Sequence, residues 1–284
     1  TDTKTDEFNA LKQYLNPPFY TATFPITGEQ LREIFCTNVD KCKSPSLDRC
    51  NEIANVINKY SDKFELNTAL KLSYFLGQIG TETQRLNKLQ ETTCYKSKDR
   101  IKEIFGKIYY CDLFEGYEAS WDECGEGHPK QCTPKLAKIT SDLVVKDKYV
   151  CSPLLIDYTY SCRMGNGTPA SGDGSKFLGK GFIHLTGKGQ FENISNLWNA
   201  DPDNVNNKKD FAGKDINEIT DNIDVAMRAS MYYWKDNELN TLVKPDMKDS
   251  QIDKVGAIVN GTNPPNSPDD RRKFTKKAYS ILIK

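Results

Sequence analysis

Two glutamates, Glu82 and Glu91, lie nine residues apart and have the side chains that paired acid–base chemistry requires. Apolar residues recur at helical spacing from Leu72 through Ile79, and they predict a buried helix whose apolar stripe continues to Glu82. Asn67 is the expected N-cap of this helix. A carboxyl group on a buried face is costly unless it is paired or opens onto a cleft, and partial desolvation favours the protonated form that a general acid needs.

Glu91 cannot share the face of Glu82 if the helix continues, because nine steps of about 100° put it on the opposite side, roughly 13.5 Å along the axis. Residues 91–95 are β-prone, so we expect the chain to turn back after Leu86 and to present Glu91 from a loop or short strand. The two carboxyl groups would then lie about 6.5 to 9.5 Å apart, which leaves room for the water of an inverting glycosidase. On spacing alone, two unrelated surface glutamates are the favoured alternative.

The composition is that of a globular chain of 284 residues, with 37% hydrophobic and 27% charged residues. Its 39 basic and 39 acidic residues give a formal net charge of zero, so the charge that nucleic-acid binding requires is missing. No apolar run reaches the length of a transmembrane helix. Residues 1–23 are polar and contain Pro17 and Pro18, and we interpret them as an N-terminal arm or linker before one domain, 24–284.

Helical spacing dominates the pattern of apolar residues. Thr27 and Gln30 form a capping-box pattern before a short apolar helix. Further helical segments are expected near residues 53–60, 191–198, 226–233, 252–259 and 274–282. Strand signals are short and fall at 91–95 and 177–185. The predicted fold class is therefore mainly α with a small β element.

The nine cysteines of the chain indicate the redox state of the compartment in which it works. They are Cys36, Cys42, Cys50, Cys94, Cys111, Cys124, Cys132, Cys151 and Cys162. No C-x-x-C motif occurs and there are only two histidines, so we expect disulfides rather than zinc, and no metal or cofactor. Disulfides indicate an oxidising compartment, secreted or periplasmic, whereas buried free thiols are the alternative. The odd count leaves at least one cysteine over, and residues 108–135 are interpreted as a disulfide-stapled insertion.

Residues 163–187 are rich in glycine. They contain neither a G-x-G-x-x-G motif after a strand nor a P-loop lysine pattern, so a nucleotide is not expected. The glycines predict tight turns where the backbone approaches a ligand or another strand. Alternation toward the end of the segment would turn Phe182, His184 and Thr186 to one face, where the hydroxyl of Thr186 could hold a water. A purely structural hairpin explains this pattern equally well.

Five blocks of the sequence, in order, carry a family resemblance. They are FPITGEQLREIF, YFLGQIGTETQRLNKLQETTCYKS, YSCRMGNGTPASGDGSKFLGKGFIHLTGKGQF, AMRASMYYWKDNELN and VNGTNPPNSPDDRRKF. The chain resembles the glycoside hydrolase family 19 chitinases over about residues 24–283, and most of all their phage endolysin and bacterial lysozyme-like branch. This resemblance implies a lysozyme-like, two-lobed helical fold with a small β-hairpin. It also implies hydrolysis of β-1,4 links between N-acetylated sugars with inversion.

The resemblance carries roles onto individual positions. The general acid, the general base and the water-positioning hydroxyl match Glu82, Glu91 and Thr186. The substrate-binding positions match Tyr95, Arg163, His184 and Asn260. A basic position that braces the carboxylates matches Arg271 or Arg272.

The sequence departs from the family pattern at four places. Thr81 stands where the family usually has His, His184 stands where it usually has Gln, and residues 83–84 replace a glycine pair. The segment 111–132 is longer than compact endolysins need. Imidazole can donate or accept one hydrogen bond as an amide does, so His184 would still bind sugar, with an added pH dependence. These departures bear on substrate specificity more than on catalysis.

The resemblance leads us to expect a peptidoglycan hydrolase of the lysozyme type that is secreted or delivered into a target cell's periplasm. The Arg-Met-Gly-Asn-Gly and Gly-Asp-Gly blocks favour peptidoglycan over chitin, and a neutral surface fits a delivered antibacterial toxin. A chitinase acting on β-1,4-linked N-acetylglucosamine is one alternative, and a catalytically silent sugar-binding module is another. The expected partners are a peptidoglycan or chitin oligosaccharide and a protein inhibitor or immunity protein, and we expect a monomer.

Overall fold

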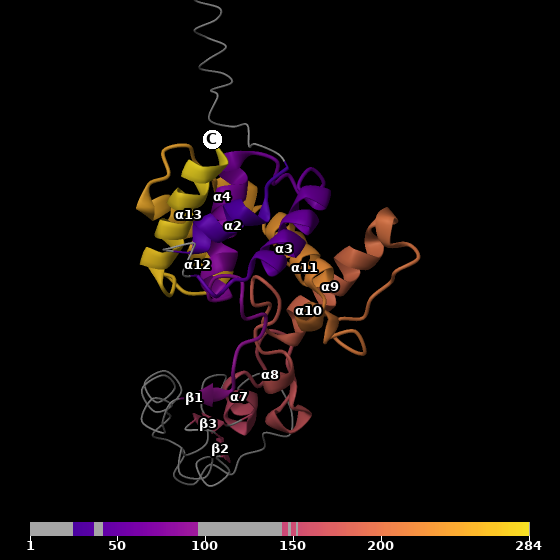
Figure 1. Ribbon diagram of the computed structural model, residues 1–284. Coiled ribbons are helices and arrows are strands. Elements are labelled where there is room, and N and C mark those ends of the chain that lie inside the picture. The colour runs from indigo at the N-terminus through magenta and orange to yellow at the C-terminus, as the bar shows by residue number, and fades with distance from the viewer. Residues whose placement is uncertain (1–24, 37–41, 96–143, 147–148, 152, 284) are drawn as a thin grey trace, which may run out of the picture. The chain divides into compact units, whose positions relative to one another are not determined.

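The computed structural model describes residues 25–36, 42–95, 144–146, 149–151 and 153–283 (Figure 1). The described chain is mainly helical, which confirms the predicted fold class. It divides into two compact units: unit 1 contains the chain up to Leu89 and from Asp221 onward, and unit 2 contains Gln90–Thr220. The predicted arm at 1–23 and the predicted insertion at 108–135 lie outside the described residues.

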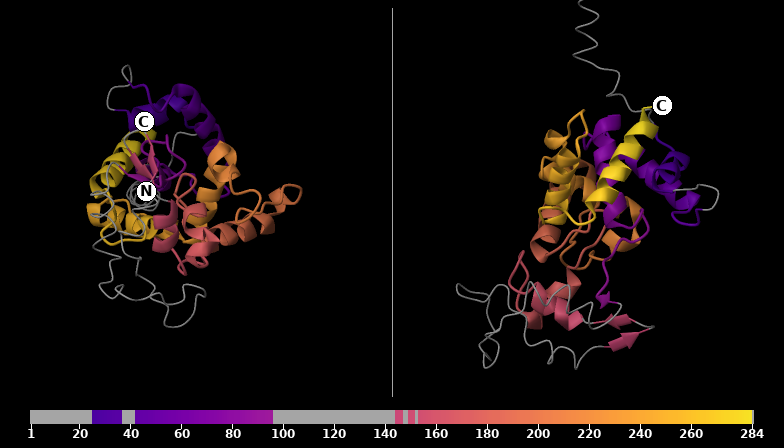
Figure 2. Two further views of the ribbon diagram at one scale, coloured as in Figure 1. Left: turned by 90° about the horizontal axis from the view of Figure 1, so that it is seen from below. Right: turned by 90° about the vertical axis from the view of Figure 1, so that its left-hand side faces the viewer.

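Unit 1 is helical throughout its described part. Its elements are α2 (Gly28–Phe35), α3 (Leu47–Tyr60), α4 (Ala69–Glu82), α11 (Ile223–Asp236), η5 (Leu239–Leu242), α12 (Asp249–Asn260) and α13 (Pro268–Leu282). These helices confirm the segments predicted from apolar spacing, and the Thr27–Gln30 capping box is formed as predicted. In Figure 2 the C-terminal helix α13, in yellow, lies along the violet helix α4, against which it packs.

Helix α4 is the central helix of unit 1, and its residues from Ala69 to Gly80 are buried with the exception of Lys71. Its neighbours approach closely because it carries glycine at two contact positions. A Cβ on Gly77 would overlap Thr275 of α13, and a Cβ on Gly80 would overlap the ring of Phe35. A helix buried on all sides has a fixed axis and rotation, so the residues at its end are held in place.

The beginning of α4 differs by one residue from the prediction. Thr68 is the N-cap, and its hydroxyl accepts a hydrogen bond from the Lys71 amide at 3.2 Å. Asn67 instead donates from its side chain to Asp62 at 3.1 Å. Both residue types cap helices well, so the sequence pattern alone does not separate adjacent candidates.

Unit 2 combines a small sheet with short helices. The strands are β1 (Cys94–Tyr95), β2 (Val144–Lys146) and β3 (Tyr149–Cys151), and the antiparallel order β1-β3-β2 places Cys94 opposite Cys151 and Val145 opposite Val150. The helices are α7 (Pro153–Thr159), η3 (Pro169–Ser171), α8 (Asp173–Lys176), α9 (Lys188–Ala200), η4 (Pro202–Asn204) and α10 (Glu218–Asp221), the last of which crosses the unit boundary. Aromatic pairs fill the core, with Trp198 packed edge-on against Phe211 at 5.4 Å between ring centroids.

The strand predicted at 177–185 was wrong. The segment forms a tight turn in which Lys180 makes isolated bridges to Gln90 and to Leu185. Gly181 and His184 have φ angles of 78° and 51°, which are left-handed and incompatible with an extended strand. Phe182, expected on the polar face, is fully buried. The predicted alternation therefore does not apply, and the sheet is built by β1, β2 and β3 instead.

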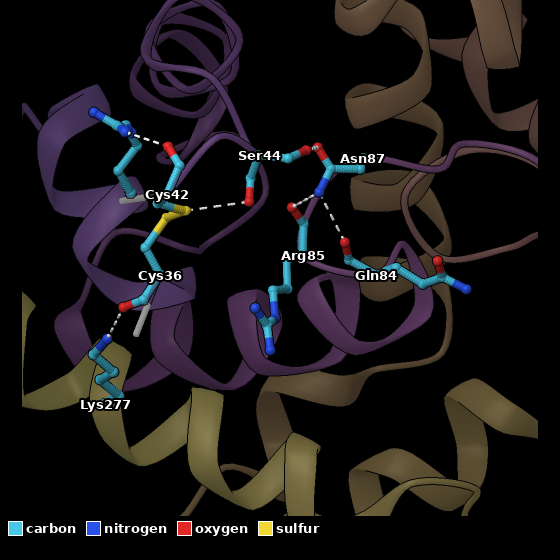
Figure 3. The surroundings of a disulfide bond; sticks show 8 residues. Cys36, Cys42, Ser44, Gln84, Arg85, Asn87 and Lys277 are labelled. Atoms are coloured by element: carbon cyan, nitrogen blue, oxygen red, sulfur yellow. Dashed lines mark hydrogen bonds between the residues drawn. A yellow bond between two sulfur atoms is a disulfide. The ribbon is translucent and has the colours of Figure 1, made fainter. Parts of the chain in front are cut away.

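Disulfides are present, as predicted from the cysteine content. Cys36 is bonded to Cys42 (Figure 3), and Cys94 and Cys162 are also disulfide-bonded. Cys50 is a buried free thiol, and burial raises its pKa to about 11, so it stays protonated and unreactive at neutral pH. Among the helices of the described ranges, none has the length and apolarity to cross a bilayer.

Candidate functional site

Glu82 is the last residue of α4, and its carboxyl group is bound by Arg271 of α13. The Nη2 group of Arg271 donates a hydrogen bond to Oε1 of Glu82. The two side chains are 1% and 10% exposed, so this is a buried ion pair. A carboxyl group held by an arginine keeps a fixed orientation.

Arg271 is itself held by two further acceptors. Its Nη1 group donates to Oε1 of Gln78 at 2.6 Å, and its Nε group donates to the backbone oxygen of Asn266 at 2.9 Å. Gln78 lies one helical turn before Glu82 on α4, so one guanidinium spans two side chains of the same helix face. The planar guanidinium is therefore fixed at all three nitrogens.

Asn260 ends α12 and organises the loop that reaches Arg271. Its side-chain oxygen accepts hydrogen bonds from the Thr262 hydroxyl at 2.6 Å and from the Asn266 amide at 2.8 Å. Because Asn266 also accepts from Arg271, a continuous polar chain joins Asn260 to Glu82.

The two candidate arginines have different partners. Arg272 pairs with Asp253 of α12 through Nη2 and Nε, at 2.5 and 2.9 Å, and reaches Asp269 at 3.2 Å. Of the two, Arg271 is the one that contacts Glu82, and Arg272 ties α13 to α12.

Tyr233 of α11 is a neighbour of Glu82 that the sequence did not indicate. Its hydroxyl donates to the backbone oxygen of Ile258 at 3.1 Å. Burial raises the pKa of Tyr233, and the charges of Glu82 and Asp236 raise it further. The phenol therefore stays neutral. No spacing in the sequence links Tyr233 of α11 to α4. Gln78 was also missed, although it lies four residues before Glu82, so a search for i, i+4 neighbours of Glu82 would have found it.

The predicted turn between Glu82 and Glu91 is present, but it follows Glu82 directly and does not begin after Leu86 as predicted. Gln84, Arg85 and Leu86 have φ angles of 51°, 66° and 66°, so three successive residues other than glycine are left-handed. Each such residue costs about 1–2 kcal/mol, so the turn persists only because its surroundings hold it. The Thr83 hydroxyl accepts from the Leu86 amide at 2.9 Å, and the Leu86 oxygen accepts from Arg49 at 2.6 Å.

Asn87 connects this turn to the segment next to the Cys36–Cys42 disulfide (Figure 3). Its amide nitrogen donates to the backbone oxygens of Gln84 and Arg85 at 2.9 and 3.0 Å. Its side-chain oxygen accepts from the Ser44 hydroxyl at 2.5 Å. The turn that leaves α4 is thus braced from a disulfide-closed segment of the chain.

Glu91 belongs to unit 2 and lies in the loop between Gln90 and β1. Its backbone amide donates to the Gly179 oxygen at 2.9 Å. The Glu91 side chain is 41% exposed and lies against Gly179, where an added Cβ would come within 2.7 Å of Oε2. Its presentation from a loop agrees with the prediction.

His184 comes to Glu91 from the turn that replaces the predicted strand, and Thr186 lies two residues further along the chain. Lys180 and Leu185 close this turn with backbone hydrogen bonds of 3.1 and 2.8 Å. The Nδ1 atom of His184 lies 3.8 Å from Oε1 of Glu91, and the His184 side chain is 9% exposed. The Thr186 hydroxyl donates to the His184 oxygen at 2.9 Å, which orients its lone pairs as acceptors.

Tyr95 and Arg163 both lie near Tyr160 in unit 2. Burial raises the pKa of Tyr95, and the neighbouring Tyr160 and Glu91 raise it further. The guanidinium of Arg163 lies 5.8 Å from the centroid of the Tyr160 ring and donates to the Thr159 oxygen at 3.3 Å. The predicted residues Tyr95 and Glu91 are thus neighbours, and Tyr160 is a common neighbour of Tyr95 and Arg163.

Each unit therefore holds one carboxylate in a distinct environment. In unit 1, a buried carboxyl is fixed by an arginine, and in unit 2 a half-exposed carboxylate lies beside an imidazole. The predicted separation of the two carboxyl groups joins the units and stays a prediction. In the part of the chain that the structure describes, no group of three or more His, Cys, Asp or Glu side chains is placed to hold a metal ion.

If Glu91 has the general-base role that the family resemblance implies, replacing Gly179 by Ala should lower kcat roughly 10- to 100-fold, because the new methyl group occupies the space of the Glu91 carboxylate and displaces it. The thermal midpoint should change little, since the displaced side chain is half exposed and flexible. Initial rates on the substrate and a thermal melt measure the two effects. An unchanged kcat would show that the position of Glu91 does not matter.

The chain is similar to a protein of Haemophilus influenzae named "Glycosyl hydrolase family 19 domain-containing protein", with 32% identity over 127 residues. These residues are 44% of this chain and 53% of the relative, so the chain spans about half the length of the curated relative that it matches. No family model matches the chain.

Proposed function

We propose, from the confirmed resemblance to glycoside hydrolase family 19, that this chain hydrolyses β-1,4 bonds between N-acetylated sugars with inversion. Glu82 is the general acid and Glu91 the general base. The observation that supports this most is the contrast between the two carboxyl groups, one buried and fixed by Arg271, the other half exposed beside His184. Two carboxyl groups in different environments can take the two different roles of acid and base.

The proposed reaction follows from these contacts. Protonated Glu82 donates its proton to the leaving glycosidic oxygen as the bond to the anomeric carbon breaks. A water attacks that carbon from the opposite face and gives one proton to Glu91. The second hydrogen stays on the water oxygen, which becomes the anomeric hydroxyl of the product, and it donates a hydrogen bond to the Thr186 oxygen, whose own proton is committed to the His184 carbonyl. Solvent then returns a proton to Glu82 and removes one from Glu91.

We assign substrate contacts to Tyr95, Arg163, His184 and Asn260. Asn260 would contact the sugar through its amide nitrogen, because its oxygen is occupied by Thr262 and Asn266. Tyr95 lies beside Glu91, and Arg163 lies beside Tyr160, which is itself a neighbour of Tyr95; this supports binding of sugar near the general base.

Peptidoglycan is the proposed substrate, in line with the lysozyme-like branch that the sequence resembles. We further propose that the chain works as an antibacterial enzyme in an oxidising compartment, secreted or delivered into a periplasm, where an inhibitor or immunity protein would restrain it. The Cys36–Cys42 disulfide supports such a compartment.

The test is digestion of purified peptidoglycan and, in parallel, of chitin oligosaccharides. Mass spectrometry of the released fragments should show N-acetylmuramic acid at the reducing end, and NMR during the reaction should show the α-anomer first. Products from chitin alone would make the chain a chitinase. Binding without products from either polymer would overturn the hydrolase and leave a silent sugar-binding module.

A further inference from the structure

Gln78 is a fully buried polar residue on the central helix of unit 1. Its side-chain oxygen accepts a hydrogen bond of 2.6 Å from Nη1 of Arg271. Its side-chain nitrogen has no hydrogen-bond partner among the described residues. A buried donor without a partner costs about 1–3 kcal/mol, so an amide at this position is not explained by stability.

We infer that Gln78 is a positioning residue that acts through Arg271 on Glu82, the general acid of the proposed function. It holds one end of the guanidinium while the other end holds the acid. This inference rests on the proposed function. It adds a residue with no role in the assignments made from sequence.

The neutrality of Gln78 is what matters for this role. A carboxylate in its place would bind Arg271 more strongly and would share its positive charge with Glu82. An aliphatic side chain would pack without an unpartnered nitrogen, but it would leave Nη1 of Arg271 unbound inside the unit. An amide fixes the guanidinium and leaves its charge directed at Glu82.

Two other ionisable groups lie near Glu82 or next to Arg271, and neither places a positive charge against the Glu82 carboxyl group. Tyr233, from α11, has a raised pKa and is neutral at the working pH, with Asp236 as a further neighbour of the phenol. Arg272, the next residue of α13, is bound by Asp253 of α12. The positive charge in hydrogen-bond contact with Glu82 is thus the one whose position Gln78 fixes.

The experiment compares the wild type with Gln78→Glu and Gln78→Met. In Gln78→Glu, the second carboxylate shares the arginine, so Glu82 should keep its proton to higher pH. The alkaline limb of kcat against pH is then expected to move upward by about one pH unit. In Gln78→Met the guanidinium loses one support, so kcat should fall about tenfold with KM changed much less, and the alkaline limb should not move upward.

A purely structural role would lower the thermal midpoint of both variants and leave the alkaline limb of both where it is, and that result would overturn the inference. If Gln78→Glu does not fold, an unchanged kcat in folded Gln78→Met would overturn it as well.

A further measurement separates failure of this inference from failure of the proposed function. If the wild type releases no product from peptidoglycan or chitin, the carboxyl carbon of Glu82 is titrated by NMR in the wild type and in Gln78→Glu. An upward shift of its midpoint in the variant supports the coupling through Arg271 without any reference to turnover. Identical titrations would contradict it.

Discussion

Replacing Glu82 by Gln is expected to reduce kcat by about 10²- to 10⁴-fold, with a small effect on stability. Glutamine has the same shape, and its oxygen can still accept the hydrogen bond from Arg271. It has no proton to donate to the leaving oxygen, so the step that needs an acid loses its donor. The measurement is the rate of fragment release from peptidoglycan, together with a thermal melt that confirms the fold.

The matched control for this variant is Glu33→Gln. Glu33 is an exposed glutamate of α2 in the same unit, and its replacement removes one negative charge at a position that has no part in the proposed reaction. Its activity should equal that of the wild type. Full activity of Glu82→Gln would remove Glu82 from the role of general acid.

Replacing Arg271 by Met is expected to lower the free energy of unfolding by about 3–5 kcal/mol and to remove most activity. The pair with Glu82 is buried, so the variant leaves a carboxylate inside the unit without its cation. Gln78 and the Asn266 oxygen lose a donor at the same time. Urea denaturation measures the stability, and product release measures the activity.

Arg272→Met is the control, because it removes the same charge from the next position of the same helix. Arg272 binds Asp253 near the surface, where water screens the pair, so a much smaller loss of stability is expected. Equal losses in the two variants would mean that the effect comes from the charge of α13 and not from the contact with Glu82.

The sequence predicted the helix that carries Glu82 and the turn that follows it, because both depend on local patterns. The apolar stripe that ends at Ile79 predicts the helix, and the β-prone run that begins at Glu91 predicts that the helix has ended before that residue. The similarity of adjacent capping residues explains why the helix start was misplaced from Thr68 to Asn67.

The turn around His184 could not be predicted in the same way. Alternating polar and apolar residues indicate a strand only if the backbone is extended, and the left-handed φ of His184 depends on the bridge between Lys180 and Leu185. That bridge joins residues whose pairing no local propensity specifies. His184 nevertheless lies next to Glu91, although the strand that was expected to present it is not formed.

The choice between Arg271 and Arg272 was also beyond the sequence. Adjacent helical residues point about 100° apart, so one of them faces α4 and the other faces α12. Which one does so depends on the rotation of α13 against its neighbours. Gln78 was overlooked for a related reason, since its importance comes from a residue of α13 that lies 193 positions away in the chain.

The three left-handed residues after Glu82 make the segment from Gln84 to Leu86 intolerant of changes in its length. Adding or deleting one residue there would shift each left-handed position onto a different side chain and would detach Asn87 from the carbonyl groups that it bonds. We therefore expect insertions and deletions to be selected against in this segment, both in nature and in directed evolution. Changes in loop length that alter the activity of the protein are expected elsewhere in the chain.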